Sequence, residues 1–162
     1  RAIEEGLFFV FPERTAKGES VSLSSIGQWD PQKVSFTEYM SLFVYGYEWL
    51  AMDPEIQENG NIQIADMEGF GWKQISKLGV SEVRTMMNIC SNIFPIKHQK
   101  FIVVRENSFT NILFKIAQPF MGKDLKEKIL FIASRICFTP YFTSEIWWIR
   151  KRHRMQQLLQ NI

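Results

Sequence analysis

Three carboxylates come closest to a catalytic arrangement. Asp66, Glu68 and Glu106 each follow a β-rich run, and open parallel sheets place their sites beyond the carboxyl ends of the strands. Carboxylates grouped in this way can act in acid–base catalysis, but no nucleophile or histidine accompanies them as a second catalytic group. The alternative is that they cap loops and pair with Lys73 or Arg105. The sequence favours this structural role and predicts a protein that is not an enzyme.

The sequence contains no pattern for a metal, a nucleotide or another cofactor. His98 and His153 lie in basic surroundings, with no cysteine or carboxylate at metal-ligand spacing. No phosphate-binding glycine loop and no GxSxG motif occurs, and the glycines of MEGFGW do not open a helix at phosphate-binding spacing. We therefore expect neither a metal site nor a cofactor.

The stretch from residue 60 to 121 predicts a βαβ unit followed by an apolar helix. Two β-rich runs, NIQIADMEG and KFIVVREN, flank a helix expected from Ser81 to Phe94, with Ser81 as its cap. This order is typical of a parallel sheet. Phe101 to Val104 is apolar throughout, which predicts a central strand covered on both faces.

The helix expected over 108–121 has a wider apolar face than a helix resting on a core needs. Polar residues occupy only a narrow strip of it. This surplus suggests that the helix has a second environment besides the core. The apolar face comprises Phe109, Ile112, Leu113, Phe114, Ile116, Ala117 and Phe120.

Weaker patterns complete the sheet and its helices. Residues 21–26 alternate like an edge strand after a hairpin-like connection, and Ile129 to Ile132 form a short apolar run that suits one more strand. A helix is expected over 36–52, with Ser35 as its N-cap. The acidic segment 55–60 is expected to be a surface loop.

Composition bounds the class of protein. The 162 residues suit one domain, and 46% hydrophobic residues with 14 phenylalanines are ample for a buried core. Nineteen basic and seventeen acidic side chains leave a net charge of +2, so we expect no nucleic-acid partner. Cys90 and Cys137 lack CxxC spacing and are expected to be reduced thiols in a cytoplasmic protein.

The final segment differs in character from the rest. The run ICFTPYFTSEIWWI, joined to the preceding ILFIAS, reaches membrane-spanning length. Arg135 and Glu145 oppose spanning, because each charge at the bilayer centre costs about 2.5–3.5 kcal/mol. A helix at the membrane interface fits better, with Trp147 and Trp148 at headgroup depth and the following RKRHR run facing anionic lipid.

Four motifs in series resemble the CRAL-TRIO lipid-binding domain family. They are GQWDP at 27–31, ENGNIQIADMEGFGW at 58–72, NIFPIKHQKFIVVREN at 92–107 and FKIAQPFMGKDLKEKI at 114–129. Their order and spacing are similar to those of the branch that contains the α-tocopherol transfer protein and the cellular retinaldehyde-binding protein. The resemblance covers residues 7–133 and leaves 134–162 as a divergent tail, for which a membrane-interfacial position is expected.

The resemblance implies an α/β fold in which a mainly parallel mixed sheet is the floor of an apolar pocket. Helices form the walls, and the 108–121 helix is the lid, which accounts for its surplus apolar face. For each pocket position, ordinary core packing is the alternative. The implied ligand-binding residues are Met40, Phe43, Tyr47, Ala65, Leu78, Met86, Ile89, Cys90, Phe94, Ile96 and Phe101.

The same resemblance implies a membrane-responsive lid and a basic docking site. Phe109, Leu113, Phe114 and Phe120 would cover the closed pocket and enter a bilayer when the lid opens. Two of the basic positions that bind a phosphoinositide in this branch are occupied here by Gln99 and Asp124. The alternative is a solvated lysine cluster that binds no ligand. The implied phosphoinositide-binding residues are Lys97, Lys100, Lys123, Lys126 and Lys128.

The sequence departs from the family pattern in two respects. The N-terminal helical subdomain is missing, and the closing elements after Ala133 are replaced by an unrelated tail. The resemblance implies a monomer, peripheral to membranes, that binds a small hydrophobic lipid such as tocopherol or a retinoid and transfers it between membranes. The alternative is a lipid-regulated membrane-anchoring or protein-interaction module without transfer activity.

Overall fold

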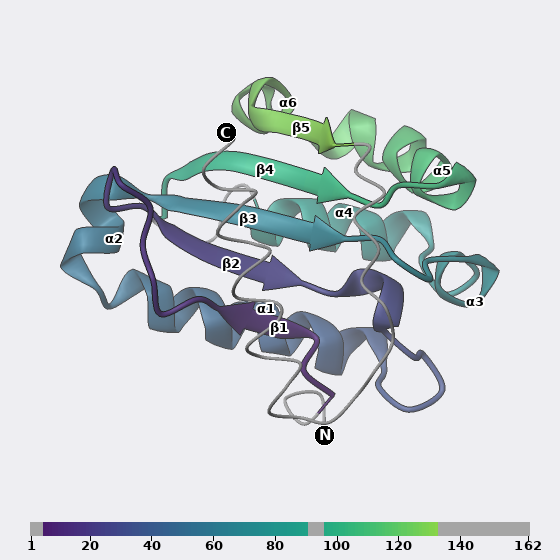
Figure 1. Ribbon diagram of the computed structural model, residues 1–162. Coiled ribbons are helices and arrows are strands. Elements are labelled where there is room, and N and C mark those ends of the chain that lie inside the picture. Colours follow the sequence, from purple (N-terminus) through teal and green to yellow (C-terminus); the bar gives the residue numbers. More distant parts are fainter. Residues whose placement is uncertain (1–4, 91–95, 133–162) are drawn as a thin grey trace.

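A single five-stranded sheet organises the protein. The computed structural model describes residues 5–90 and 96–132, so the predictions for Phe94 and 134–162 lie outside the described residues. The strand order is β1-β2-β3-β4-β5 (Figure 1). β1 runs antiparallel to β2, and every other neighbouring pair is parallel, which confirms the predicted mixed, mainly parallel sheet. The strands are β1 Phe8–Val10, β2 Ser20–Ser24, β3 Asn61–Asp66, β4 His98–Val104 and β5 Ile129–Ile132.

Helices connect the parallel strands. Figure 1 shows α1 and α4 together behind the sheet, α3 and α5 at the end toward which the strands point, and α2 at the opposite end. The helices are α1 Phe36–Ala51, α2 Pro54–Asn59, α3 Trp72–Ile75, α4 Val80–Asn88, α5 Ser108–Ala117 and α6 Lys123–Lys128, with the 3-10 turns η1 Ile26–Gln28 and η3 Gln118–Phe120.

Helix boundaries follow capping chemistry, and two predictions are wrong because they overlooked it. Ser35 caps α1 as predicted, in a capping box with Glu38. The segment expected to be a loop is the helix α2, since Asp53 caps it and Pro54 occupies its first turn. Ser81 does not cap α4, which begins after Gly79.

The helix predicted over 108–121 is shorter than expected. α5 ends at Ala117 and continues as the 3-10 turn η3. Pro119 lies within this turn and has no backbone N–H to donate to an α-helical ladder. The apolar stripe of the sequence therefore spans two short elements, α5 and η3.

β2 is an interior strand, whereas the sequence predicted an edge. β1 lies on one side of it and β3 on the other. The serines of β2 face the same side as the polar residues of β3 and are buried with them. Ser20 donates to Asn61 Oδ1 at 2.8 Å, and Ser22 donates to Gln63 Oε1 at 2.7 Å. These cross-strand hydrogen bonds allow a serine-rich strand to be fully covered.

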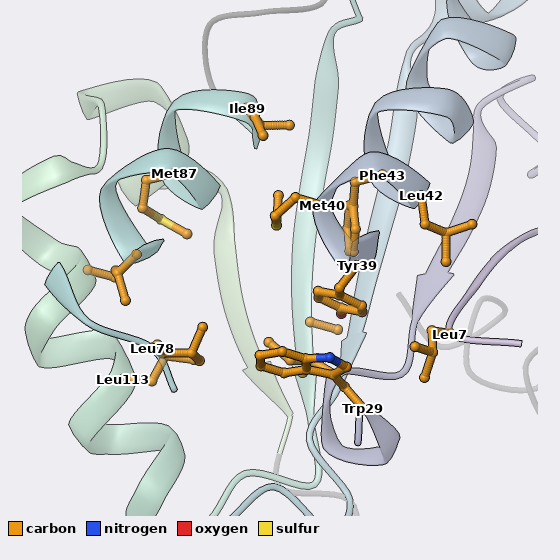
Figure 2. Close-up of a cluster of buried hydrophobic side chains, with 14 of the residues drawn as sticks. Leu7, Trp29, Tyr39, Met40, Leu42, Phe43, Leu78, Met87, Ile89 and Leu113 are labelled. Carbon is orange, nitrogen blue, oxygen red and sulfur yellow. The ribbon is translucent and has the colours of Figure 1, made fainter. Parts of the chain in front are cut away.

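Both faces of the sheet are buried. On the face opposite α1 and α4, Ile102 and Val104 of β4 join an apolar cluster with residues of β2 and β3. Val103 belongs to the larger cluster on the helix side. The prediction that 101–104 is covered on both faces is therefore confirmed. Figure 2 shows the larger cluster, in which Met40 and Phe43 lie across from Met87 and Ile89.

The GQWDP turn joins β2 to α1 through close backbone packing. A Cβ atom on Gly27 would lie 2.0 Å from the Glu68 carbonyl oxygen, so only glycine fits there. Gln74 Nε2 donates to the carbonyl oxygens of Gly27 at 3.1 Å and Trp29 at 2.9 Å. This turn thereby holds the ends of β2 and β3 and the start of α3 together.

Candidate functional site: an apolar cavity beneath α5

An apolar cavity of about 50 Å³ lies between the sheet and the helices that cover it. α1, α4, α5 and α6 all contribute to its wall, and β2 to β5 form its floor. Pockets for drug-sized ligands measure about 300–1,000 Å³, so a lipid enters only if this closed arrangement opens. Its lining residues are Ser24, Ile26, Tyr39, Phe43, Ala65, Met67, Met86, Met87, Cys90, Phe101, Leu113, Phe114, Ala117, Met121, Leu125 and Ile129.

The cavity brings together part of the residue set inferred from the sequence. Five of the predicted pocket residues border it, and so do two of the predicted lid residues. Phe94 lies outside the described residues. Met40, Tyr47, Leu78, Ile89 and Ile96 are buried in the surrounding core instead. Those that border the cavity are Phe43, Ala65, Met86, Cys90, Phe101, Leu113 and Phe114.

Sequence reasoning missed several of the residues that line the cavity. Tyr39 was passed over, although it lies one helical turn before Phe43 on the same face of α1. Met121, Leu125 and Ile129 come from the end of η3, from α6 and from the start of β5, so no single periodicity could predict that they line the cavity together.

α5 forms the side of the cavity nearest the solvent. Leu113 and Ala117 are buried against the core, whereas Phe114 is half-buried and packs edge-on against Phe131 of β5, with ring centroids 4.9 Å apart. Phe109 packs against the core without bordering the cavity, and Phe120 borders a shallow polar hollow beside α4. Of the four predicted lid residues, two therefore face the cavity in this closed state.

The segment that leads into α5 is anchored by charge. Arg105 has a positive φ of 57° and its guanidinium pairs with the carboxylates of Asp66 and Glu68. Asn107 caps α5, and its Nδ2 donates to the carbonyl oxygen of Phe70 at 2.9 Å. The amino-terminal end of α5 is thus tied to the β3–α3 loop by an ion pair and a hydrogen bond.

The same ion pair gives two of the three grouped carboxylates a structural role. Asp66 and Glu68 are engaged by Arg105, and Lys73 pairs with Asp30 at 2.8 Å instead. Asp66 is buried, so its charge is matched by a partner rather than presented to a substrate. This geometry agrees with the structural role that the sequence favoured.

The polar groups beside the cavity are neutral at physiological pH. Burial raises the pKa of the Cys90 thiol to about 12, against the opposing effect of the neighbouring Tyr47 hydroxyl. Burial also raises the pKa of Tyr39 and of Tyr47 well above the usual value for a phenol. A protonated thiol is a poor nucleophile, so these groups supply hydrogen-bonding capacity rather than covalent chemistry.

The lysines implicated in docking lie at the start of β4 and on α6, and α6 packs against β4. Lys123 is paired weakly with Glu127 at 4.0 Å, and Lys128 is paired with Asp124 at 2.7 Å. Lys97 and Lys126 are exposed and make no ion pair with another described residue. The described part of this surface is therefore basic but partly neutralised.

The CRAL/TRIO domain family model matches residues 4–146. The chain belongs to this family. Proteins of the family are in general lipid-binding and lipid-transfer proteins.

Individual relatives agree with this assignment. Rat clavesin-1 is 30% identical over 132 residues, which is 82% of this chain and 37% of clavesin-1. Human clavesin-2 is 24% identical over 112 residues, 69% of this chain and 34% of clavesin-2. The chain thus spans about a third of the length of these relatives. The crystal structure of Sfh5 shares the fold, with a TM-score of 0.62 at 13% identity, over 81% of this chain and 50% of that chain.

Among residues 5–90 and 96–132, no helix combines the length and the apolarity that crossing a bilayer requires. No histidine, cysteine and carboxylate side chains gather there in a way that could hold a metal ion.

His98 is a half-buried titratable residue at the edge of this core. Its ring packs edge-on against Tyr47, with centroids 5.4 Å apart, and its Nδ1 has no hydrogen-bond partner among the described residues. Burial lowers the pKa of His98 to about 4, helped by Lys128 and opposed by Asp124. The imidazole is therefore neutral in the folded protein at pH 7.

We expect the free energy of unfolding to fall as the pH drops from about 6.5 to about 4. In this window the unfolded chain binds a proton at His98 and the folded chain does not, so protonation favours unfolding. His98 lowers the free energy of unfolding by about 3 kcal/mol at pH 4, and this decrease is absent above pH 6.5. Urea unfolding of the wild type and of His98→Phe across this range measures it, and identical pH profiles of the two proteins would contradict it.

Proposed function

We propose that this domain binds one small hydrophobic lipid in the cavity beneath α5 and transfers it between membranes. The observation that carries this proposal is a void lined almost wholly by apolar side chains, beside a large cluster of buried apolar residues. A void of this lining gains nothing from water, which needs polar partners. An apolar guest fills it with favourable contacts.

The lining suits a guest that is larger than the closed void. Met67, Met86, Met87 and Met121 border it, and unbranched thioether side chains repack at low cost. Each methylene transferred from water into such a site contributes about 0.8 kcal/mol. Apolar burial alone therefore suffices to retain a tocopherol-like or retinoid-like compound, with no covalent attachment.

α5 is the element best placed to act as the lid. Its amino-terminal end is anchored through Arg105 and Asn107, whereas its cavity face rests on apolar contacts such as that of Phe114 with Phe131. Apolar contacts can be exchanged for contacts with acyl chains at little net cost. A bilayer would thus favour an open state that water disfavours.

Docking on the membrane is proposed to use the lysines of β4 and α6. α6 follows η3 directly, so these basic residues lie next to the carboxyl-terminal end of the lid. Phosphoinositide headgroups carry several negative charges, and exposed lysines near a membrane each contribute about 1 kcal/mol of attraction. Docking there would bring α5 against the acyl chains.

Mass spectrometry of the lipid that co-purifies with the protein tests the binding proposal. We expect one neutral hydrophobic compound per chain, because apolar burial retains such a guest through purification. An empty pocket in a protein that still binds vesicles would contradict transfer. It would favour the alternative of a membrane-anchoring or interaction module.

Phe114→Asp is expected to slow lipid transfer between vesicles by roughly tenfold or more, since it places a charge on the face that must enter the bilayer. Fluorescent-lipid transfer between donor and acceptor vesicles measures the rate. Asn111→Asp is the matched control, because it adds the same charge on the exposed side of the same helix. Equal transfer rates for the two variants would contradict the lid role of α5.

Charge reversal of Lys97 and Lys126 together is expected to weaken binding to vesicles that contain phosphatidylinositol bisphosphate by roughly tenfold. Vesicle co-sedimentation at several salt concentrations measures this, and the salt dependence should become shallower. Lys77→Glu, an exposed lysine just after α3, is the control. If the control loses as much binding as the double variant, the attraction is a property of the whole surface. That result would contradict a specific docking site at Lys97 and Lys126.

A further inference from the structure

The hydroxyl group of Tyr39, whose side chain borders the cavity, is buried without a hydrogen-bond partner among the described residues. Tyr39 is 1% exposed and borders the cavity, and its hydroxyl makes no hydrogen bond within the described part of the chain. Buried polar groups in native proteins are nearly always paired, so an unpaired hydroxyl in such a place needs an explanation. One explanation is that a bound ligand accepts the hydrogen bond of this hydroxyl.

The ring of Tyr39 is held in one orientation by its neighbours. It stacks on Trp29, with ring centroids 5.2 Å apart and an interplanar angle of 17°, and meets Phe43 edge-on, also at 5.2 Å. Figure 2 shows Tyr39 lying over Trp29. A fixed donor is suited to directional recognition.

The other hydroxyl at the cavity is already engaged. Ser24 donates to the Ile64 carbonyl oxygen at 3.3 Å and accepts from Gln63 Nε2 at 3.3 Å. Tyr47 donates to Gln63 Oε1 at 3.3 Å, away from the cavity lining. A water molecule in the void would find too few polar partners to be held. Tyr39 therefore offers a hydrogen bond that a ligand is best placed to accept.

We propose that the Tyr39 hydroxyl donates a hydrogen bond to the ligand, and that the cavity thereby selects a neutral lipid with an oxygen acceptor at one end. This inference rests on the proposed lipid-binding function. No lysine or arginine borders the cavity as described, so a carboxylate or phosphate would be buried there without a counter-charge. The chemical class is an otherwise apolar alcohol, aldehyde or ketone.

Three probes of equal chain length test this selection: 2-undecanone, undecane and undecanoate. The ketone accepts hydrogen bonds and cannot donate them, so it isolates the role of Tyr39 as a donor. Titration with each probe, followed by tryptophan fluorescence, uses the buried Trp29 beside Tyr39 as a reporter. At pH 7 undecanoate should bind at least about tenfold more weakly than the ketone.

Tyr39→Phe should weaken binding of 2-undecanone by about three- to tenfold and leave undecane unchanged. The variant keeps the ring contacts and loses an unpaired hydroxyl, so its melting temperature without ligand should not fall. Tyr45→Phe is the matched control, because it removes a phenol hydroxyl from the exposed side of the same helix. It should leave the ratio of ketone to hydrocarbon affinity as in the wild type.

Three results would overturn the inference. An equal loss of affinity for ketone and hydrocarbon in Tyr39→Phe would assign Tyr39 to packing alone. Undiminished ketone binding in that variant would show that another group binds the oxygen. Failure of the wild type to bind either neutral probe would overturn the lipid-binding function itself, and this outcome is distinct from the other two.

Discussion

The hydrogen bonds between the side chains of β2 and β3 are the constraint on which the rest of the structure depends. Ser22 and Gln63 are directly opposite one another and both face the helices, where unpaired polar groups would be costly. A slip of one residue would turn these side chains to the other face and bring Val21 and Ile62 under α1. The polar pairing therefore fixes the register, and the register puts Ala65 and Phe101 on the cavity floor.

A second consequence of this register is that the carboxyl ends of β3 and β4 are adjacent. Asp66 and Val104 are partners in the ladder, so the residue after Val104 lies beside Asp66. Arg105 accordingly reaches its carboxylate partners across the strand ends. The charges at the sheet edge fix one end of α5, while its middle rests on side chains around a void. An anchored end beside a face that borders a cavity is compatible with the hinged lid proposed above.

Much of the fold was predictable, and the errors have identifiable causes. The periodicity of the 60–121 stretch predicted its strands and helices because burial there follows simple periods. The edge assignment for β2 was wrong because a period-two alternation does not show how many neighbours a strand has. Ser20, Ser22 and Ser24 are all buried and hydrogen-bonded to β3. The cavity residues were only partly predicted. A residue on an apolar stripe can face either a solid core or a void, and spacing does not distinguish the two.

The sequence alone determined the family, the mainly parallel sheet and the apolar surplus of α5, since local propensities and motif order are written along the chain. The tertiary structure decided which apolar side chains enclose the void and which carboxylates Arg105 neutralises. It also decided that the Tyr39 hydroxyl finds no hydrogen-bond partner in the described part of the chain. These properties depend on distances between residues far apart in the chain, and such distances exist only once the sheet register and the helix packing are set.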